Sequence, residues 1–164
     1  MAITVLNSET GENMEMSMSD YIFGVVSAEM PAEYHVESLK AQAVAAYTYA
    51  LYKSKENADK PYDITDSFSS DQHYINYEKA CEKWGENANK YTEKIKNAIK
   101  SVEGEYISFS GEPILALYHA ISGGKTENAV DVFSVELPYL VSCDSIGDLL
   151  ENDYSTTLNL TAEQ

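Results

Sequence analysis

The feature that most constrains the fold of this chain is an alanine-rich stretch at residues 36–55. It holds five alanines, the residue with the highest helix propensity, and this predicts one long helix. Small side chains let a helix approach its neighbours closely. We therefore expect this helix to be central in the fold.

A shorter helix is predicted before it, from about Asp20 to Met30. Ser17 or Ser19 can cap its start, and Pro31 ends it. Within this helix one stripe, at spacing i, i+3, i+4 and i+7, is formed by Ile22, Val25, Val26 and Glu29.

Glu29 is the unusual member of that stripe, because the other three residues are apolar and should face the core. It also lies in the last turn, where the helix dipole is negative. Burial and the dipole would both disfavour the charged carboxylate, as in a general acid that works near neutral pH. The alternative is that Glu29 turns outward at the helix end and is solvated. Glu33, in the turn after Pro31, is expected at the surface.

The rest of the chain mixes further helix and strand signals with loops. Residues 3–18 favour two short strands around a turn, and residues 57–77 a long polar loop. Further along, the sequence predicts a helix at 91–102, a hairpin with strands at 105–109 and 114–119, a glycine-bearing loop at 122–127, and a polar tail after 148 that is frayed at its end. Without βαβ alternation this order predicts an α+β fold, with residues 1–164 as one domain.

Charge excludes one class of function. The formal charge is −16, and all eleven basic residues are Lys, so no basic stripe exists to neutralise phosphates. Nucleic acid is therefore excluded as a partner, and docking on an anionic membrane is disfavoured. An uncharged glycan stays compatible.

The cysteines and the apolar runs give little further information. Cys81 and Cys143 lack a zinc-binding spacing, and either a disulfide or two free thiols would suit them. No apolar run is long enough to span a membrane, and no signal peptide is visible.

Three motifs occur in an order that resembles one known family. Residues 20–31 contain Gly-Val-Val and end in Ala-Glu-Met-Pro, and residues 39–46 contain Lys-Ala-Gln-Ala-Val-Ala-Ala. Residues 122–127 read Ser-Gly-Gly-Lys-Thr-Glu, and Pro-Tyr-Leu follows at 138–140. Together they resemble the SpoIID family, the stage II sporulation protein D family, over residues 3–148.

The resemblance implies a lytic transglycosylase that cuts peptidoglycan between N-acetylmuramic acid and N-acetylglucosamine, with Glu29 as the catalytic acid. One carboxylate suffices, because the 6-hydroxyl of the sugar replaces water as the nucleophile and leaves a 1,6-anhydro end. We predict no cofactor and no metal. The resemblance also implies an extracytoplasmic, membrane-tethered enzyme of sporulation and engulfment that acts with a cell-wall amidase and a membrane scaffold protein.

Substrate contacts are expected from two further segments. The resemblance places a Gln- and Tyr-containing segment beside the groove, and backbone N–H groups of the glycine loop can form a nest for an N-acetyl carbonyl or an oxyanion. His119 precedes that loop and suits either a supporting role or a structural one. The predicted substrate-binding residues are Gln72, Tyr74, His119, Ser122, Gly123, Gly124 and Thr126. We expect Ser122–Gly124 to lie within contact distance of Glu29.

Two departures from the family pattern keep other functions open. Tyr47 stands where relatives have Arg, and Ser-Ile-Gly-Asp at 145–148 replaces a Ser-Pro-Trp-Asp type ending. The missing Arg favours a non-catalytic module that binds peptidoglycan and enhances an amidase, whereas the intact Ala-Glu-Met-Pro favours the enzyme. A purely structural assembly subunit would not need Glu29.

Overall fold

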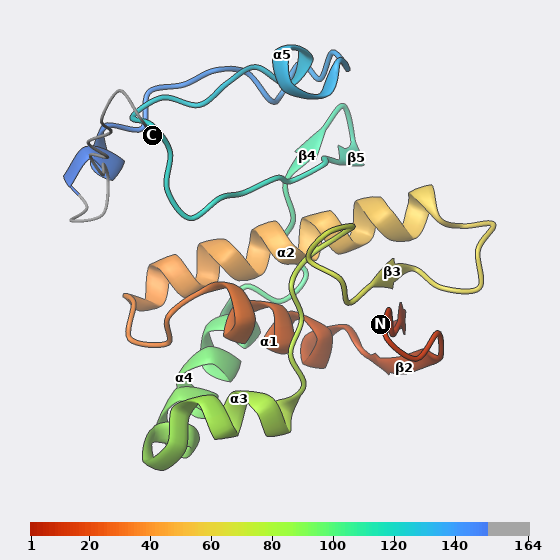
Figure 1. The fold of residues 1–164 in the computed structure, drawn as a ribbon, viewed down its shortest axis with the longest axis vertical. Helices are drawn as coiled ribbons and strands as arrows, with labels where there is room; N and C mark the ends of the chain where they lie inside the picture. Colours follow the sequence, from red (N-terminus) through yellow and green to blue (C-terminus); the bar gives the residue numbers. More distant parts are fainter. Residues whose placement is uncertain (151–164) are drawn as a thin grey trace, which may run out of the picture. The chain divides into compact units, whose positions relative to one another are not determined.

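A computed structural model describes residues 1–150, so the predicted frayed end of the tail lies outside the described residues. The chain divides into two compact units, Met1–Leu117 and Tyr118–Gln164, which are described separately (Figure 1). The expectation that they form one domain stays a prediction.

The first unit holds four α-helices and two small sheets. Its elements are β1 (Ala2–Leu6), β2 (Asn13–Ser17), α1 (Met18–Glu29), α2 (Val36–Glu56), β3 (Ile64–Thr65), α3 (Tyr77–Trp84), a short 3-10 helix (Gly85–Asn87), α4 (Ala88–Ser101), β4 (Ser108–Phe109) and β5 (Glu112–Pro113). The described part of the second unit contains α5 (Ala129–Phe133) and a 3-10 helix (Ile146–Leu150). The fold is α+β, as predicted.

Helix α1 is the most enclosed element of the first unit. It contacts α2, α3 and α4, and its residues from Tyr21 to Ser27 are all buried. Its start is fixed as predicted, because the Ser17 hydroxyl accepts a hydrogen bond of 3.0 Å from the backbone N–H of Asp20. It ends where Met30 takes the extended backbone that suits a residue before proline.

Helix α2 confirms the helix predicted from the alanine-rich stretch. Ala43, Ala46 and Ala50 are buried, and the helix packs on both α1 and α4. Small side chains permit this close approach to two neighbours at once.

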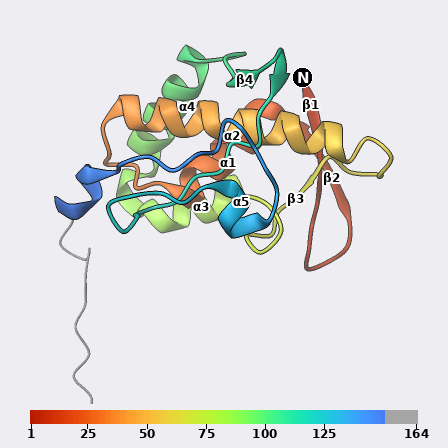
Figure 2. The same cartoon turned by 90° about the horizontal axis from the view of Figure 1, so that it is seen from above.

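The larger sheet has the strand order β2-β1-β3 and lies at one end of the helices (Figures 1 and 2). Strands β1 and β2 form the predicted antiparallel pair, with Val5 opposite Met14. Strand β3 is parallel to β1 and pairs Ile64 with Val5. The sequence placed β3 inside a structureless loop, which is wrong: two residues are too few to show an alternating pattern.

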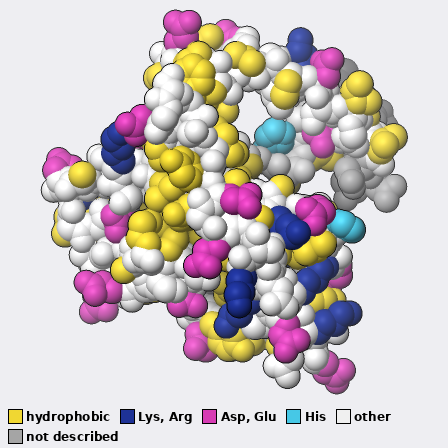
Figure 3. All heavy atoms as spheres, turned by 180° about the vertical axis from the view of Figure 1, so that it is seen from behind, with side chains coloured by type: hydrophobic (Ala, Val, Ile, Leu, Met, Phe, Trp, Pro, Cys, Tyr) yellow, Lys and Arg dark blue, Asp and Glu magenta, His cyan; other side chains and the backbone are white. Residues whose placement is uncertain are grey.

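Two other elements differ from the prediction. Helix α3 was missed, because it is a short polar helix whose only buried residue is Ala80. The predicted hairpin is present but short, with Ser110 and Gly111 in its turn at positive φ. Acidic side chains are spread over the face shown in Figure 3, so the charge of −16 forms no single acidic patch there.

Candidate active site at the end of helix α1

Glu29 is the last residue of α1 and is exposed. Its Oε1 accepts a hydrogen bond of 3.0 Å from the backbone N–H of His73. Ile22, Val25 and Val26 are buried as predicted. Of the two orientations left open for Glu29, toward the core or outward, the structure shows the outward one. The physical reason is that the helix stops at this residue, so the side chain turns outward.

Residues 71–75, called the 71–75 segment below, run along α1. Gln72 is 3% exposed, and its side-chain amide donates to the Tyr21 hydroxyl (3.1 Å) and to the carbonyl of Ala46 (3.3 Å). The ring of Tyr74 stacks on that of Tyr21, with centroids 5.7 Å apart. The segment therefore touches both α1 and α2.

Gly24 lets the 71–75 segment approach so closely. A Cβ at this position would lie 2.3 Å from the ring of Tyr74 and 2.5 Å from the carbonyl oxygen of Ile75. These distances exclude any side chain unless the segment moves. The glycine of the Gly-Val-Val motif thus has a packing role.

These contacts give different roles to Gln72 and Tyr74, the two substrate-binding residues predicted in this region. The side chain of Gln72 is buried and holds the 71–75 segment in place. Tyr74 is half-buried, which leaves it as the candidate of this segment for substrate contact.

Two lysines fix the chain on either side of Glu29. Lys83 donates to the carbonyl of Ser27 (2.9 Å), in the last turn of α1. Lys94 donates to three successive carbonyls, those of Ala32 (2.8 Å), Glu33 (3.2 Å) and Tyr34 (2.5 Å). Cations at a helix C-terminus stabilise its unpaired carbonyls, and α1 has no basic residue of its own there. No sequence signal pointed to these contacts.

Glu33, the other carboxylate near the end of α1, is exposed as predicted. A hydrogen bond from the Tyr91 hydroxyl is the largest cause that lowers its pKa. A low pKa keeps Glu33 ionised, which is the wrong state for a general acid near neutral pH.

The glycine loop belongs to the second unit and is tied to residues 142–148. The backbone N–H of Ser122 donates to Asp148 Oδ2 over 2.8 Å, and the Ser122 hydroxyl donates to the same oxygen. Thr126 donates its N–H to the carbonyl of Cys143 (2.9 Å), and its hydroxyl accepts from the Cys143 N–H (2.9 Å). These bonds hold the loop from both ends.

The predicted nest is partly used by the loop itself. The N–H of Gly124 donates to the Ser122 hydroxyl over 3.1 Å. Gly124 has a φ of +88°, which side chains rarely adopt, and a Cβ would meet Leu149 at 2.8 Å. A nest at Gly123 and Gly124 stays a prediction.

Glu29 lies in the first unit and Ser122–Gly124 in the second, so their predicted contact stays a prediction. His119 is exposed in the second unit. Its charge contributes, after hydrogen bonds from Ser122 and Ser145, to lowering the pKa of Asp148.

Comparison with known proteins decides the family. The sequence profile of SpoIID, described as "Stage II sporulation protein", matches residues 7–109, more than half of the chain. The chain belongs to the SpoIID family. It is 30% identical to "Stage II sporulation protein D" of Bacillus subtilis over 100% of this chain and 49% of that protein. The corresponding protein of Bacillus amyloliquefaciens is also 30% identical, over 96% of this chain and 46% of its own length.

A third relative has a different name. The "Amidase enhancer" of Bacillus subtilis is 33% identical over 86% of this chain and 17% of its own length. The chain thus spans about half the length of the two sporulation proteins and a smaller share of the enhancer.

The altered ending of the SpoIID pattern has a structural explanation. Of residues 145–148, Ser145 and Asp148 are the two that match the Ser-Pro-Trp-Asp type ending which the resemblance implies. The Ser145 hydroxyl donates to Asp148 Oδ2 (2.7 Å), the same oxygen that binds Ser122. The altered positions, Ile146 and Gly147, are both exposed. The substitutions therefore spare the bonds that hold the glycine loop.

Tyr47, the position at which the resemblance implies an arginine, lines a cavity of about 610 Å³ in the first unit. Lys96 and Lys100 of α4 line the same cavity, together with Asp20 and Glu103. The cavity that Tyr47 lines thus contains two basic and two acidic side chains.

Three findings bear on metals, thiols and membranes. Within residues 1–150, no group of three or more His, Cys, Asp or Glu side chains is arranged to hold a metal ion. Cys81 and Cys143 are free thiols and lie in different units. Among the described helices, none combines the length and the apolar character needed to cross a membrane.

Proposed function

We propose that this chain is a lytic transglycosylase that cleaves the bond between N-acetylmuramic acid and N-acetylglucosamine in peptidoglycan and forms a 1,6-anhydro end. The observation that carries the proposal is the state of Glu29: an exposed carboxyl group at the end of a buried helix, oriented through Oε1 by the His73 N–H. Among the described residues no hydrogen bond reaches Oε2, so this oxygen is available to a substrate.

One carboxyl group is enough for the chemistry. Protonated Glu29 gives its proton to the glycosidic oxygen as the bond to C1 of the muramic acid breaks. The resulting carboxylate then takes the proton of the 6-hydroxyl of the same sugar, whose oxygen attacks C1. Glycosidases that use water need a second carboxyl group for this step. The cycle ends with Glu29 protonated again, and it uses no cofactor.

The neighbours of Glu29 have supporting roles in this proposal. Tyr74 presents a half-buried ring on which a sugar can stack. The Ser122–Gly124 loop, with Thr126 and His119, supplies polar groups to the N-acetyl substituents of the glycan in this proposal. We place the enzyme outside the cytoplasm, on the cell-wall side of the membrane, where a cell-wall amidase and a membrane scaffold protein are its partners.

The second candidate function is a peptidoglycan-binding module that enhances an amidase without cutting glycan. Two points favour it: Tyr47 stands where the resemblance implies an arginine, and a relative 33% identical is named "Amidase enhancer". Such a module needs to bind glycan but does not need a proton donor.

Digestion of purified peptidoglycan separates the two functions. The enzyme releases anhydro-muropeptides, which mass spectrometry identifies by the loss of water relative to hydrolysed ends. Glycan binding without release would favour the enhancer. If folded protein neither binds nor cleaves glycan, whether intact or peptide-stripped, both candidate functions are contradicted.

A further inference from the structure

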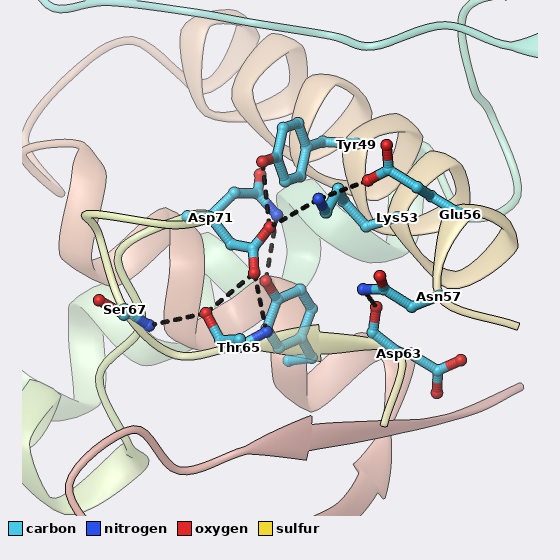
Figure 4. Close-up of polar contacts among 10 residues, drawn as sticks. Tyr49, Lys53, Glu56, Asn57, Asp63, Thr65, Ser67 and Asp71 are labelled. Carbon is cyan, nitrogen blue, oxygen red and sulfur yellow. Dashed lines mark hydrogen bonds and ion pairs between the residues drawn. The ribbon is translucent and has the colours of Figure 1, made fainter. Parts of the chain in front are cut away.

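Asp71 carries a buried carboxylate that the proposed reaction does not use. Its side chain is 3% exposed. Oδ2 accepts from the backbone N–H of Thr65 (3.0 Å) and from the Thr65 hydroxyl (2.9 Å). Oδ1 accepts from the Tyr49 hydroxyl (3.2 Å) and lies 3.5 Å from Lys53 Nζ, and Figure 4 shows these groups converging on the carboxylate.

The partners of Asp71 are matched to a charged carboxylate. Burial, and then the negative charge of Asp71, raise the pKa of Tyr49, so its hydroxyl stays protonated and donates. Partial burial lowers the pKa of Lys53, but the hydrogen bond to Glu56 and the charge of Asp71 outweigh it and raise the pKa overall. Buried charges persist in proteins when they are paired and hydrogen-bonded in this way.

Asp71 connects three elements to the segment that reaches Glu29. Thr65 belongs to β3, which is paired to β1, while Tyr49 and Lys53 come from α2. Two residues after Asp71, the N–H of His73 meets the Glu29 carboxyl group. The sheet and α2 thus determine where this N–H points.

We propose that Asp71 is a positioning residue for Glu29: its carboxylate anchors the 71–75 segment, so that the His73 N–H holds Glu29 Oε1 in the orientation needed for proton transfer. This inference rests on the proposed function for its catalytic consequence only. The positioning itself is a structural property and can be measured without substrate.

The test uses the amide proton of His73 as a reporter, because a hydrogen bond to a carboxylate moves an amide proton downfield in NMR spectra. Asp71→Asn keeps the size of the side chain and removes its charge. We expect the His73 amide proton to move upfield in Asp71→Asn, because its hydrogen bond to Glu29 Oε1 lengthens or breaks. Asp66→Asn is the matched control, since Asp66 lies in the same loop but binds Ser8.

Tyr49→Phe provides a second variant if Asp71→Asn folds poorly, because it removes one donor and keeps the ring. It should move the His73 amide proton in the same direction by a smaller amount. An unchanged His73 amide in both variants, at native secondary structure, would overturn the proposal. A shift of the His73 amide proton in Asp66→Asn as large as that in Asp71→Asn would also overturn it.

The catalytic arm compares kcat and KM on glycan. Misplacement by about 1 Å costs on the order of 100-fold in rate, so we expect kcat of Asp71→Asn to fall about 10- to 100-fold. KM should stay near the parent value, because buried Asp71 touches no substrate. If the unsubstituted protein has no activity on glycan, the proposed function is contradicted. The NMR result would still decide whether Asp71 positions Glu29. Normal kcat in a variant with a displaced His73 amide would refute the catalytic role of Asp71.

Discussion

The backbone N–H of His73 donates to Glu29 Oε1 over 3.0 Å, although 44 positions separate the two residues in the chain. The bond joins the end of α1 to a segment that is anchored independently on α2 and on the sheet. A carboxyl group that is exposed at a helix end would otherwise rotate freely. The bond therefore gives an exposed side chain the defined orientation that the proposed proton transfer needs.

Glu29→Gln should abolish glycan cleavage and leave binding nearly intact. Gln is almost isosteric, and its carbonyl oxygen can still accept from His73, but it cannot deliver a proton to the leaving oxygen. Loss of a general acid lowers the rate by about 10²–10⁴-fold. Because Glu29 is exposed, the free energy of unfolding should change by less than about 0.5 kcal/mol. The measurement is anhydro-muropeptide release at matched thermal stability.

Glu33→Gln is the matched control for that variant, and it should release product at close to the parent rate. Release by Glu29→Gln at the parent rate would show that Glu29 is not the acid.

Gly24→Ala should destabilise the first unit and displace the 71–75 segment. The new Cβ would lie 2.3 Å from the Tyr74 ring and 2.5 Å from the backbone oxygen of Ile75, and a backbone atom cannot rotate away. Overpacking of this kind costs about 1–3 kcal/mol. Denaturant unfolding measures the cost, and Gly147→Ala is the control because nothing lies within 4 Å of its Cβ position. Equal stability of the two variants would mean that the segment is not tightly packed.

Lys94→Met should loosen the turn that follows Glu29. The ammonium group donates to three carbonyls at residues 32–34, which then lose their charged partner. Hydrogen bonds to a charged group contribute about 1.5–3 kcal/mol, and part of this is recovered from water because Lys94 is half-exposed. We expect a lower Tm and faster hydrogen exchange in the turn. Lys79→Met, at an exposed position of α3, should change neither quantity; an equal effect in both variants would refute a specific role of Lys94.

The contact between Ser122 and Asp148 should break in acid. Hydrogen bonds from the Ser122 and Ser145 hydroxyls and from the Ser122 N–H lower the pKa of Asp148. The unfolded chain has the ordinary pKa of about 3.9, so the stabilisation of the folded second unit is fully present above that pH. It is lost as the pH falls through the lower pKa of the folded state.

An acid titration followed at the Ser122 amide proton checks this prediction. The shift should change below about pH 3.9, the ordinary value for Asp. Asp148→Asn should remove the transition. A midpoint above the ordinary value would contradict the direction of the shift.

Local patterns in the sequence were enough to predict α1, α2 and a serine cap on α1 at Ser17 or Ser19, of which Ser17 is the cap observed. The three motifs also identified the family and pointed to Glu29. They failed for β3 and α3, where two residues and a polar helix carry too little periodicity to be seen. They left the orientation of Glu29 open, since a single residue at a helix boundary decides whether a side chain faces the core.

The sequence by itself determined helices α1 and α2, the family and the candidate acid, because periodicity, capping and motifs are properties of neighbouring residues. Only the tertiary structure decided what surrounds that acid. His73 reaches Glu29 across 44 positions, and Lys94 reaches Ala32 across 62. Asp71 has its partners Tyr49 and Lys53 on α2 and Thr65 on β3, and nothing in the spacing of these residues announces that they meet. Such contacts exist only after helices and sheet have packed, because packing brings distant backbone donors and buried charges together.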